Sequence, residues 1–251
     1  MEKFIRSRDI MKSTFSEDYE SDQQKLLPQP PLQKPYDADC QLIDLPKVDK
    51  DIITKPDIYD CIIDRKSHRE YNSDALSIEE LSYLLWMTQG VKEIRGDNYA
   101  AIRPTPSAGA RHPFETYLSI DNVDGLKKGI YRYLALEHKL LLLKEEDDLY
   151  TKLTNGANGQ KFAGAAPVNF IWSCIPYRGE WRYTDRAYKV MLIDAGHIGH
   201  ALYIACETIG LGTCAIAAYD QQLMDELIEV DGEDEFVVYM SPVGKVKLAF
   251  N

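Results

Sequence analysis

A short run of basic and hydrogen-bonding residues, RKSHR at positions 65–69, is the first stretch whose residue types point to a ligand. Three cations, a hydroxyl and an imidazole follow one another where a helix is expected to end. Such a set can bind a phosphate group through charge-assisted hydrogen bonds. A charged, solvated helix end is the plainer interpretation of this run when it is taken alone.

Two glycine-containing stretches are further candidates. In Pro106-Ser107-Ala108-Gly109-Ala110, small residues beside prolines let a backbone approach a flat ligand and direct N–H groups at it, although a tight loop without a ligand has the same signature. GLGTCAI at 210–216 has the order helix, glycine turn, strand. A dinucleotide fingerprint needs a strand followed by a helix, so this turn is not a Rossmann site.

Residue spacing gives little support to metal or triad chemistry. His197 and His200 lie three residues apart on an expected helix, but no third ligand follows at helical spacing, which favours partly buried, hydrogen-bonded histidines. The five cysteines are scattered without a CxxC pair. Nucleophile triads assemble only in space, so none can be derived from the spacing here.

The element expected to position these candidates is a long helix within residues 187–216. Its apolar residues recur every three or four positions, and its small residues permit close approach of another backbone. About 23 residues form a rod of ~35 Å. Gly210 and Gly212 are expected to end the helix, and residues 213–216 to form a short strand.

The rest of the chain mixes helices with strands. We expect helices from Pro56, from the capping box Ser77/Glu80 to Gly90, over 145–154 and after Asp220. We expect strands at 114–120, 129–134, 138–144, 168–175 and 236–243. Residues 177–188 are expected to form a loop. This order predicts an α+β fold with one sheet packed against several helices. Residues 1–55 are expected to form an extended, proline-rich arm on a surface of this chain or of a partner, ahead of one domain over 56–251.

The composition limits the possible functions. The net charge of −11 argues against general binding of nucleic acid or of an anionic membrane, but not against a local basic pocket. An odd number of cysteines indicates reduced thiols, the N-terminus lacks a signal-peptide core, and no uncharged apolar run could span a bilayer. We therefore expect a soluble, cytoplasmic protein.

In order and spacing, these stretches together resemble the FMN-dependent nitroreductase superfamily. Residues 65–71 match its R-x-S-x-R-x-[FY] motif, and 84–91, 106–113, 129–133, 194–197 and 210–212 are similar to its SagB-type dehydrogenase branch. The resemblance covers roughly residues 57–247. It implies a nitroreductase-like fold, with a central, mainly antiparallel sheet packed between helices, in an intertwined homodimer with two FMN sites at the subunit interface.

The resemblance also implies a role for individual residues. Arg65, Lys66 and Ser67 would hold the phosphate and ribityl end of FMN, and Arg69 would lie near the pyrimidine edge, where a cation stabilises the charge left by reduction. The residues expected at the flavin of the other subunit are Pro106, Ser107, Ala108 and Gly109. Those expected along the flavin are Ile216, Ala217 and Ala218, with the Ala217 N–H meeting N5. Lys245 or Lys247 would complete the phosphate site.

The implied activity is reduction of nitro or quinone-like small molecules, with NAD(P)H as electron donor and both reactants using one flavin face in turn. No side-chain acid or base is required, so no catalytic residue is named. Tyr183, Arg186 and Tyr188 are candidates to line the substrate pocket.

Three alternatives remain open from the sequence. Peptide-modifying SagB-like enzymes oxidise thiazolines or oxazolines to azoles with FMN and oxygen, so a modified peptide is an alternative substrate. Some carry a Lys-Tyr pair, which stands here in reverse as Tyr188-Lys189. Flavin-cleaving or dehalogenating relatives usually add a lid insertion, and the extra lengths here are the arm and the 177–187 loop. The intact Arg65, Ser67 and Arg69 set argues against a cofactor-free scaffold.

Overall fold

A computed structural model describes residues 5–12, 14–15, 19–37 and 39–246. Its helices are α1 (Ile5–Lys12), α2 (Ile58–Asp64), α3 (Ile78–Gln89), α4 (Leu149–Gly156), α5 (Lys161–Gly164), α6 (Tyr177–Tyr183), α7 (Ala187–Thr208) and α8 (Gln221–Ile228). Its strands are β1 (Leu42–Asp44), β2 (Glu93–Arg95), β3 (Ala100–Ile102), β4 (Phe114–Ile120), β5 (Gly129–Leu134), β6 (Lys139–Glu145), β7 (Val168–Cys174), β8 (Leu211–Thr213) and β9 (Phe236–Lys245).

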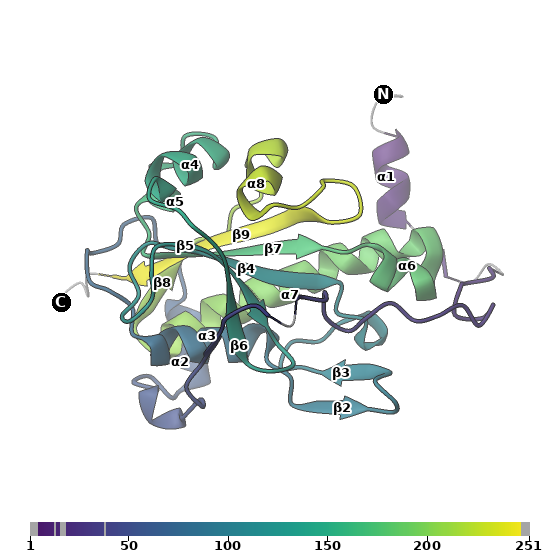
Figure 1. Ribbon diagram of the computed structural model, residues 1–251, viewed down its shortest axis with the longest axis horizontal. Helices are drawn as coiled ribbons and strands as arrows, with labels where there is room; N and C mark the ends of the chain where they lie inside the picture. The colour runs from purple at the N-terminus through teal and green to yellow at the C-terminus, as the bar shows by residue number, and fades with distance from the viewer. Residues whose placement is uncertain (1–4, 13, 16–18, 38, 247–251) are drawn as a thin grey trace.

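An antiparallel sheet of seven strands forms the centre of the molecule (Figure 1). The strand order is β1-β6-β5-β4-β7-β9-β8, and every pairing is antiparallel. All residues of β4, β5 and β7 are buried, because helices cover both faces of the sheet. The predicted central, mainly antiparallel sheet of an α+β fold is therefore confirmed.

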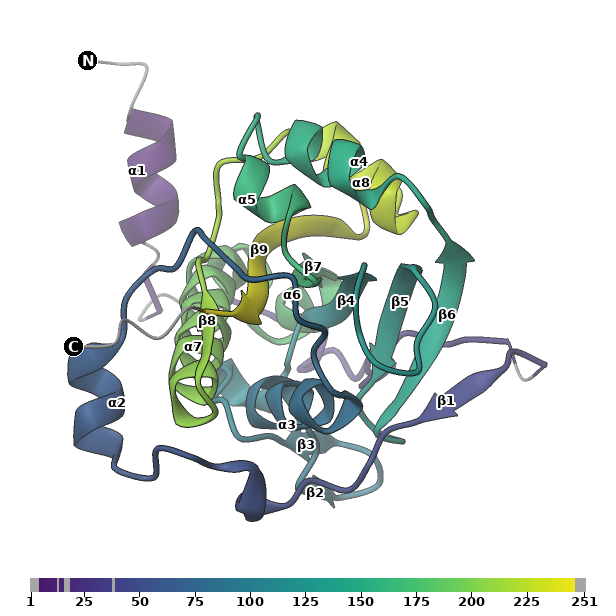
Figure 2. The ribbon, with the colours of Figure 1, turned by 90° about the vertical axis from the view of Figure 1, so that its left-hand side faces the viewer.

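The helices form two layers, one on each face of the sheet (Figure 2). On one face, α3 and α7 enclose a large apolar cluster with residues such as Leu84, Leu118 and Leu202. On the other face, α4, α5 and α8 enclose a smaller cluster that includes Leu153, Ile171 and Met224. Each sheet face therefore has its own core, and the long helix belongs to the larger one.

The long helix α7 confirms most of what its sequence predicts. Residues of the apolar stripe, among them Met191, Ile198 and Leu202, are buried, and Gly210 takes a φ of 74° just after the helix. The predicted strand at 213–216 is placed wrongly, because β8 covers Leu211–Thr213. Gly212 lies inside that strand and does not end the helix.

Local sequence signals place several other elements correctly. Ser77 and Glu80 form both hydrogen bonds of the capping box of α3, and Gly90 is its C-cap. Asp220 caps α8 through the Leu223 N–H at 3.0 Å. The predicted strands at 114–120, 129–134, 168–175 and 236–243 match β4, β5, β7 and β9 within two residues.

Other expectations are wrong. The stretch 177–188 is helical over Tyr177–Tyr183 and Thr184–Arg186, and α4 begins at Leu149 because Asp148 caps it. Residues 93–102 contain the β2–β3 hairpin, where no strands were expected. Helix α2 begins at Ile58 after the N-cap Asp57, two residues past the expected Pro56.

Residues 19–37 of the N-terminal arm lie against their own chain (Figure 1). The Lys34 ammonium pairs with the buried Glu235 at 2.5 Å, and the Lys34 N–H donates to Glu115 at 2.7 Å. Further along, β1 pairs with β6 at the edge of the sheet. The arm and the rest of the chain therefore share one sheet. None of the described helices has the length and apolar character needed to cross a bilayer.

Candidate functional site

The basic segment 65–71 runs as extended chain beside the sheet edge formed by β8 and β9. The His68 N–H donates to the Thr213 carbonyl at 2.9 Å, and the Asn72 N–H donates to the Lys245 carbonyl at 2.9 Å. A Cβ at Gly212 would lie 2.7 Å from the His68 Cγ. The glycine in this strand is therefore needed for the close approach of the segment.

Tyr71 anchors the end of the segment. Its hydroxyl donates to the His68 carbonyl at 2.8 Å and to the Pro242 carbonyl at 3.2 Å. Burial raises the pKa of this hydroxyl, so it stays a donor over the whole physiological range. A Cβ at Gly244 would lie 2.8 Å from the Tyr71 ring, so the strand makes room for this anchor as well. The aromatic position of the motif is thus structural.

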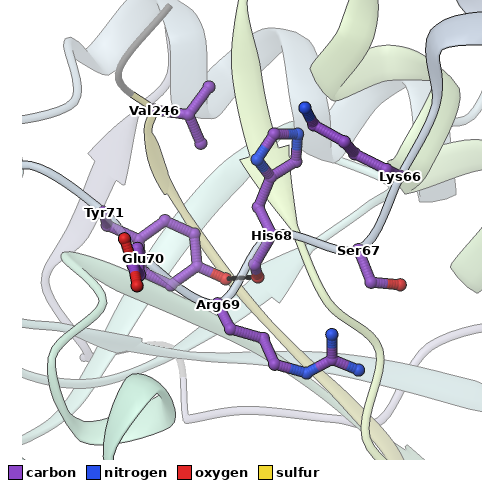
Figure 3. A pocket seen from close by; sticks show the side chains of 7 residues that line it. All are labelled: Lys66, Ser67, His68, Arg69, Glu70, Tyr71 and Val246. Atoms are coloured by element: carbon purple, nitrogen blue, oxygen red, sulfur yellow. Dashed lines mark hydrogen bonds between the residues drawn. The ribbon is translucent and has the colours of Figure 1, made fainter. Parts of the chain in front are cut away.

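Side chains of the segment alternate between two sides, as they do in any extended chain. Figure 3 shows Lys66 and His68 pointing to one side of the backbone, and Ser67 and Arg69 to the other. The pocket here has a volume of about 370 Å³ and is lined by Lys66, Ser67, His68, Arg69, Glu70, Tyr71 and Val246. Burial and the charge of Lys66 lower the pKa of His68, so this imidazole is neutral at pH 7.

Tyr203 of α7 joins the segment to the chain that leaves the long helix. Its hydroxyl lies 2.9 Å from the Ser67 Oγ and accepts the Ala215 N–H at 2.9 Å. The Arg65 guanidinium lies 5.2 Å from the centre of the Tyr203 ring. Tyr203 is not among the site residues expected from the sequence. Its hydroxyl near the end of a helix that leads to a candidate site was the available signal.

Residues 216–218 lie on the same side of the molecule as Arg69. The Arg69 guanidinium lies 5.9 Å from the ring centre of Phe162 in α5, and Gln160, next to this helix, donates to the Ala218 carbonyl at 3.0 Å. Neither Gln160 nor Phe162 was predicted. The Ile216 side chain is buried in the core, and its backbone pairs with Met240, so it offers no side-chain surface here.

Ala217 and Ala218, which follow Ile216, are exposed. Among the residues that the structure describes, no acceptor takes the Ala217 N–H. This donor is therefore available to a ligand.

The cations of the segment lack counter-charges. In the described part of the chain, no carboxylate lies within ion-pair distance of Arg65, Lys66 or Arg69. This is unusual in a protein with a net charge of −11, in which acidic side chains outnumber basic ones. Lys66 and Arg69 line the pocket, and Arg65 lies next to it in the chain. Cations without a carboxylate partner among the described residues favour an anionic ligand such as a phosphate monoester.

The loop at 106–110 lies on another face of the molecule. The Ser107 hydroxyl and the Ala108 N–H donate to the Asp194 carboxylate at 2.6 and 3.1 Å, and burial raises the pKa of that carboxyl. Asp194 and Tyr203 are nine residues apart on α7. At ~100° per residue they lie about half a turn from each other and roughly 14 Å apart along the axis. One chain therefore does not bring the loop to the basic segment.

The remaining candidates are scattered. The Lys245 ammonium lies 3.7 Å from Glu80, and Lys245 does not line the pocket at 66–71, while Lys247 lies outside the described residues. The Tyr188 hydroxyl donates to Glu180 at 2.7 Å, and the Arg186 guanidinium stacks on Tyr19 at 4.2 Å. No group of potential metal ligands occurs among the described residues.

Comparison with known proteins gives consistent matches over this architecture. The model of the nitroreductase family matches residues 62–245. The nitroreductase-family protein MJ1384 of Methanocaldococcus jannaschii is 30% identical over 74% of this chain and 89% of its own length. The trifolitoxin-processing protein TfxB of Rhizobium leguminosarum bv. trifolii is 27% identical over 51% of this chain and 36% of its own length.

Two solved structures share the fold. One from Ralstonia eutropha, described as a nitroreductase, has a TM-score of 0.68 and 23% identity over 88% of this chain and 95% of its own. The microcin synthetase McbBCD of E. coli, solved with truncated pro-MccB17 bound, matches with a TM-score of 0.61 and 21% identity, over 73% of this chain and 71% of that chain.

Proposed function

Because this chain belongs to the nitroreductase family, we propose that this oxidoreductase uses FMN to reduce nitro or quinone-like small molecules with NAD(P)H. The observation that carries the proposal is a set of three cations, Arg65, Lys66 and Arg69, that have no carboxylate partner among the described residues, together with the exposed Ala217 and Ala218 on the side of the molecule where Arg69 lies. The cations suit a phosphate, and the free N–H suits the edge of a flat heterocycle.

Each residue of the set has a physical task. Arg65, Lys66 and the Ser67 hydroxyl bind the phosphate and ribityl end, and Tyr203 orients Ser67. Arg69 places a positive charge near the ring edge, and the Ala217 N–H donates a hydrogen bond to the ring. When bound, FMN supplies the two-electron chemistry, and the protein supplies position and electrostatics. These tasks require no side-chain acid or base.

We further propose a homodimer with two such sites, to which the loop of residues 106–109 contributes across the interface. Along α7, an apolar groove of about 350 Å³ is lined by Met87, Pro104, Thr105, Pro106, His197, His200, Ala201, Ile204, Ala205 and Thr208. A Cβ at Gly196 would meet nothing within 4 Å, and Leu192 and Ile193 are 60% and 49% exposed. In a monomer this apolar face would remain exposed to water, whereas in a dimer a second copy of the chain would cover it.

Replacing Ile193 by aspartate is expected to convert the dimer to a monomer, because an unpaired carboxylate would be buried in the interface. Sedimentation velocity at micromolar concentration measures the change. Leu223→Asp is the matched control, since Leu223 is 43% exposed on α8, on the opposite layer of the molecule. A mass of two chains for Ile193→Asp would rule out this face as the interface.

The activity is tested with purified protein to which FMN has been added. Consumption of NAD(P)H is followed with a nitroaromatic or a quinone as acceptor, and we expect turnover that requires both FMN and the acceptor. If the protein binds FMN but NAD(P)H does not reduce the bound flavin, the proposed reductase activity is contradicted and the second candidate is favoured.

That second candidate is oxidation of peptide thiazolines or oxazolines to azoles with FMN and oxygen. Its support is the similarity of this chain to TfxB, which is named as a trifolitoxin-processing protein, and the fold it shares with the peptide-bound microcin synthetase. A peptide carrying a thiazoline distinguishes the candidates, because its oxidation lowers the peptide mass by ~2 Da and consumes oxygen without NAD(P)H.

A further inference from the structure

The loop that follows Pro106 has a backbone that needs outside support. Gly109, Ala110 and His112 have φ values of 58°, 54° and 45°, in the left-handed region. Alanine and histidine rarely adopt this region unless the surroundings hold them there. The contacts that hold this loop therefore decide where its backbone lies.

The Arg111 side chain links the loop to the residues around it. Its Nε donates to the Gly109 carbonyl at 3.2 Å, and its Nη2 donates to the Tyr99 carbonyl at 2.6 Å. The guanidinium lies 4.8 Å from the ring centre of Tyr99 and 5.4 Å from that of Trp181. Arg111 is 4% exposed. A planar guanidinium can stack and donate at once, which an ammonium cannot do.

The N-terminal arm holds the ring on which Arg111 stacks. The Trp181 Nε1 donates to the Leu27 carbonyl at 3.0 Å, and the Gln23 N–H donates to the Trp181 carbonyl at 2.9 Å. The Gln23 amide also donates to the Tyr99 hydroxyl at 3.0 Å. Both rings that flank Arg111 are therefore tied to residues 23–27, which lie outside the stretch matched by the family model.

Helix α6 closes over the loop from the other side. A Cβ at Gly109 would lie 2.4 Å from the Tyr183 hydroxyl and 3.0 Å from the Arg182 Nε. The Arg182 Nη1 donates to the same Tyr99 hydroxyl at 2.8 Å that Gln23 contacts. Gly109 is thus enclosed by α6, and the arm holds Trp181 of this helix in place.

We propose that Arg111 is a positioning residue for the loop of residues 107–112, and that the arm sets this position by holding Trp181. The inference rests on the proposed function, in which this loop contacts the flavin of the second copy. The arm is then part of the cofactor site, although none of its residues is expected to touch the flavin.

The first test measures hydrogen exchange of the amides of 107–112 in flavin-free, full-length protein. We expect exchange about tenfold faster in Arg111→Met, the factor for one lost hydrogen bond, and a smaller increase in Trp181→Phe, which keeps an aromatic ring but loses the donor to Leu27. Arg111→Lys should not restore protection. Arg95→Met is the control, because Arg95 lies exposed on the neighbouring hairpin and forms an ion pair with the exposed Glu93.

The second test measures FMN dissociation constants of the same variants, which we expect to rise in the same order as the exchange rates. Unchanged exchange in both Arg111→Met and Trp181→Phe would overturn the proposal, as would faster exchange with an unchanged FMN dissociation constant. If Arg111→Met does not fold, Trp181→Phe decides by the same two criteria. Wild-type protein that binds no FMN would instead refute the proposed function, and the exchange rates would still decide whether Arg111 positions the loop.

Discussion

Replacing Arg69 by alanine is expected to weaken FMN binding about 10- to 100-fold, the range for loss of one or two hydrogen bonds from a charged donor. Arg69 has no carboxylate partner among the described residues, so its removal breaks no ion pair within that part of the chain. Its side chain is exposed, and its guanidinium lies 5.9 Å from the ring centre of Phe162. The loss should therefore appear in flavin affinity and not in stability.

Fluorescence titration of flavin-free protein with FMN measures the effect, and thermal unfolding checks the fold. Arg69→Lys keeps the charge without the planar donor set and should fall between the wild type and Arg69→Ala. Arg95→Ala removes an exposed arginine far along the chain and should leave the affinity unchanged. Equal FMN affinity of Arg69→Ala and the wild type would remove the segment 65–69 from the cofactor site.

Replacing Arg178 by methionine is expected to lower the free energy of unfolding by about 3–5 kcal/mol, because it removes the ion-pair partner of the buried Glu115 carboxylate. The two side chains are 3% and 5% exposed, and the Arg178 Nη2 lies 2.5 Å from Glu115. A chain of this size should lose about 2–4 °C of melting temperature per kcal/mol. Urea unfolding measures the change. Lys128→Met removes an exposed pair with Asp121 and should cost less than about 1 kcal/mol.

The stability difference should depend on pH in a defined direction. Burial alone would raise the pKa of Glu115, but the charge and hydrogen bond of Arg178 and the Lys34 N–H lower it below its ordinary value. The wild type therefore gains stability from this group above its ordinary pKa and loses it as the pH falls through the lowered pKa. In Arg178→Met burial dominates, so Glu115 takes up a proton as the pH falls. The difference between the two proteins should shrink from pH 8 toward about pH 4.5, and a constant difference would show that Glu115 is not the cause.

Elements with local signals could be predicted, and elements held by distant contacts could not. The residues of the α3 capping box and of the apolar stripe of α7 lie close together in the sequence. Helix α6 has no side-chain cap, and its Trp181 is held by Leu27 from the arm, 154 residues away. Strand β1 has three residues and pairs only with the distant β6. Such contacts leave no periodic pattern in the sequence.

The candidate site shows the same division. The segment 65–69 could be recognised because its cations are adjacent in the chain. Tyr203 lies 136 residues from Ser67, and its hydroxyl reaches Ser67 only after α7 has packed on the sheet. Gly212 was interpreted as a helix terminator, whereas its missing side chain makes room for His68. That room exists only in the folded protein.

Because Asp194 and Tyr203 lie on opposite sides of α7, cofactor binding is coupled to self-association in the proposed dimer. Each chain then carries two unmatched halves of a site, and only a pair of chains assembles two whole ones. By thermodynamic reciprocity, the factor by which flavin tightens association equals the factor by which association tightens flavin binding. Dilution would therefore release cofactor as well as separate the chains, so abundance in the cell would itself set how much of the protein is loaded.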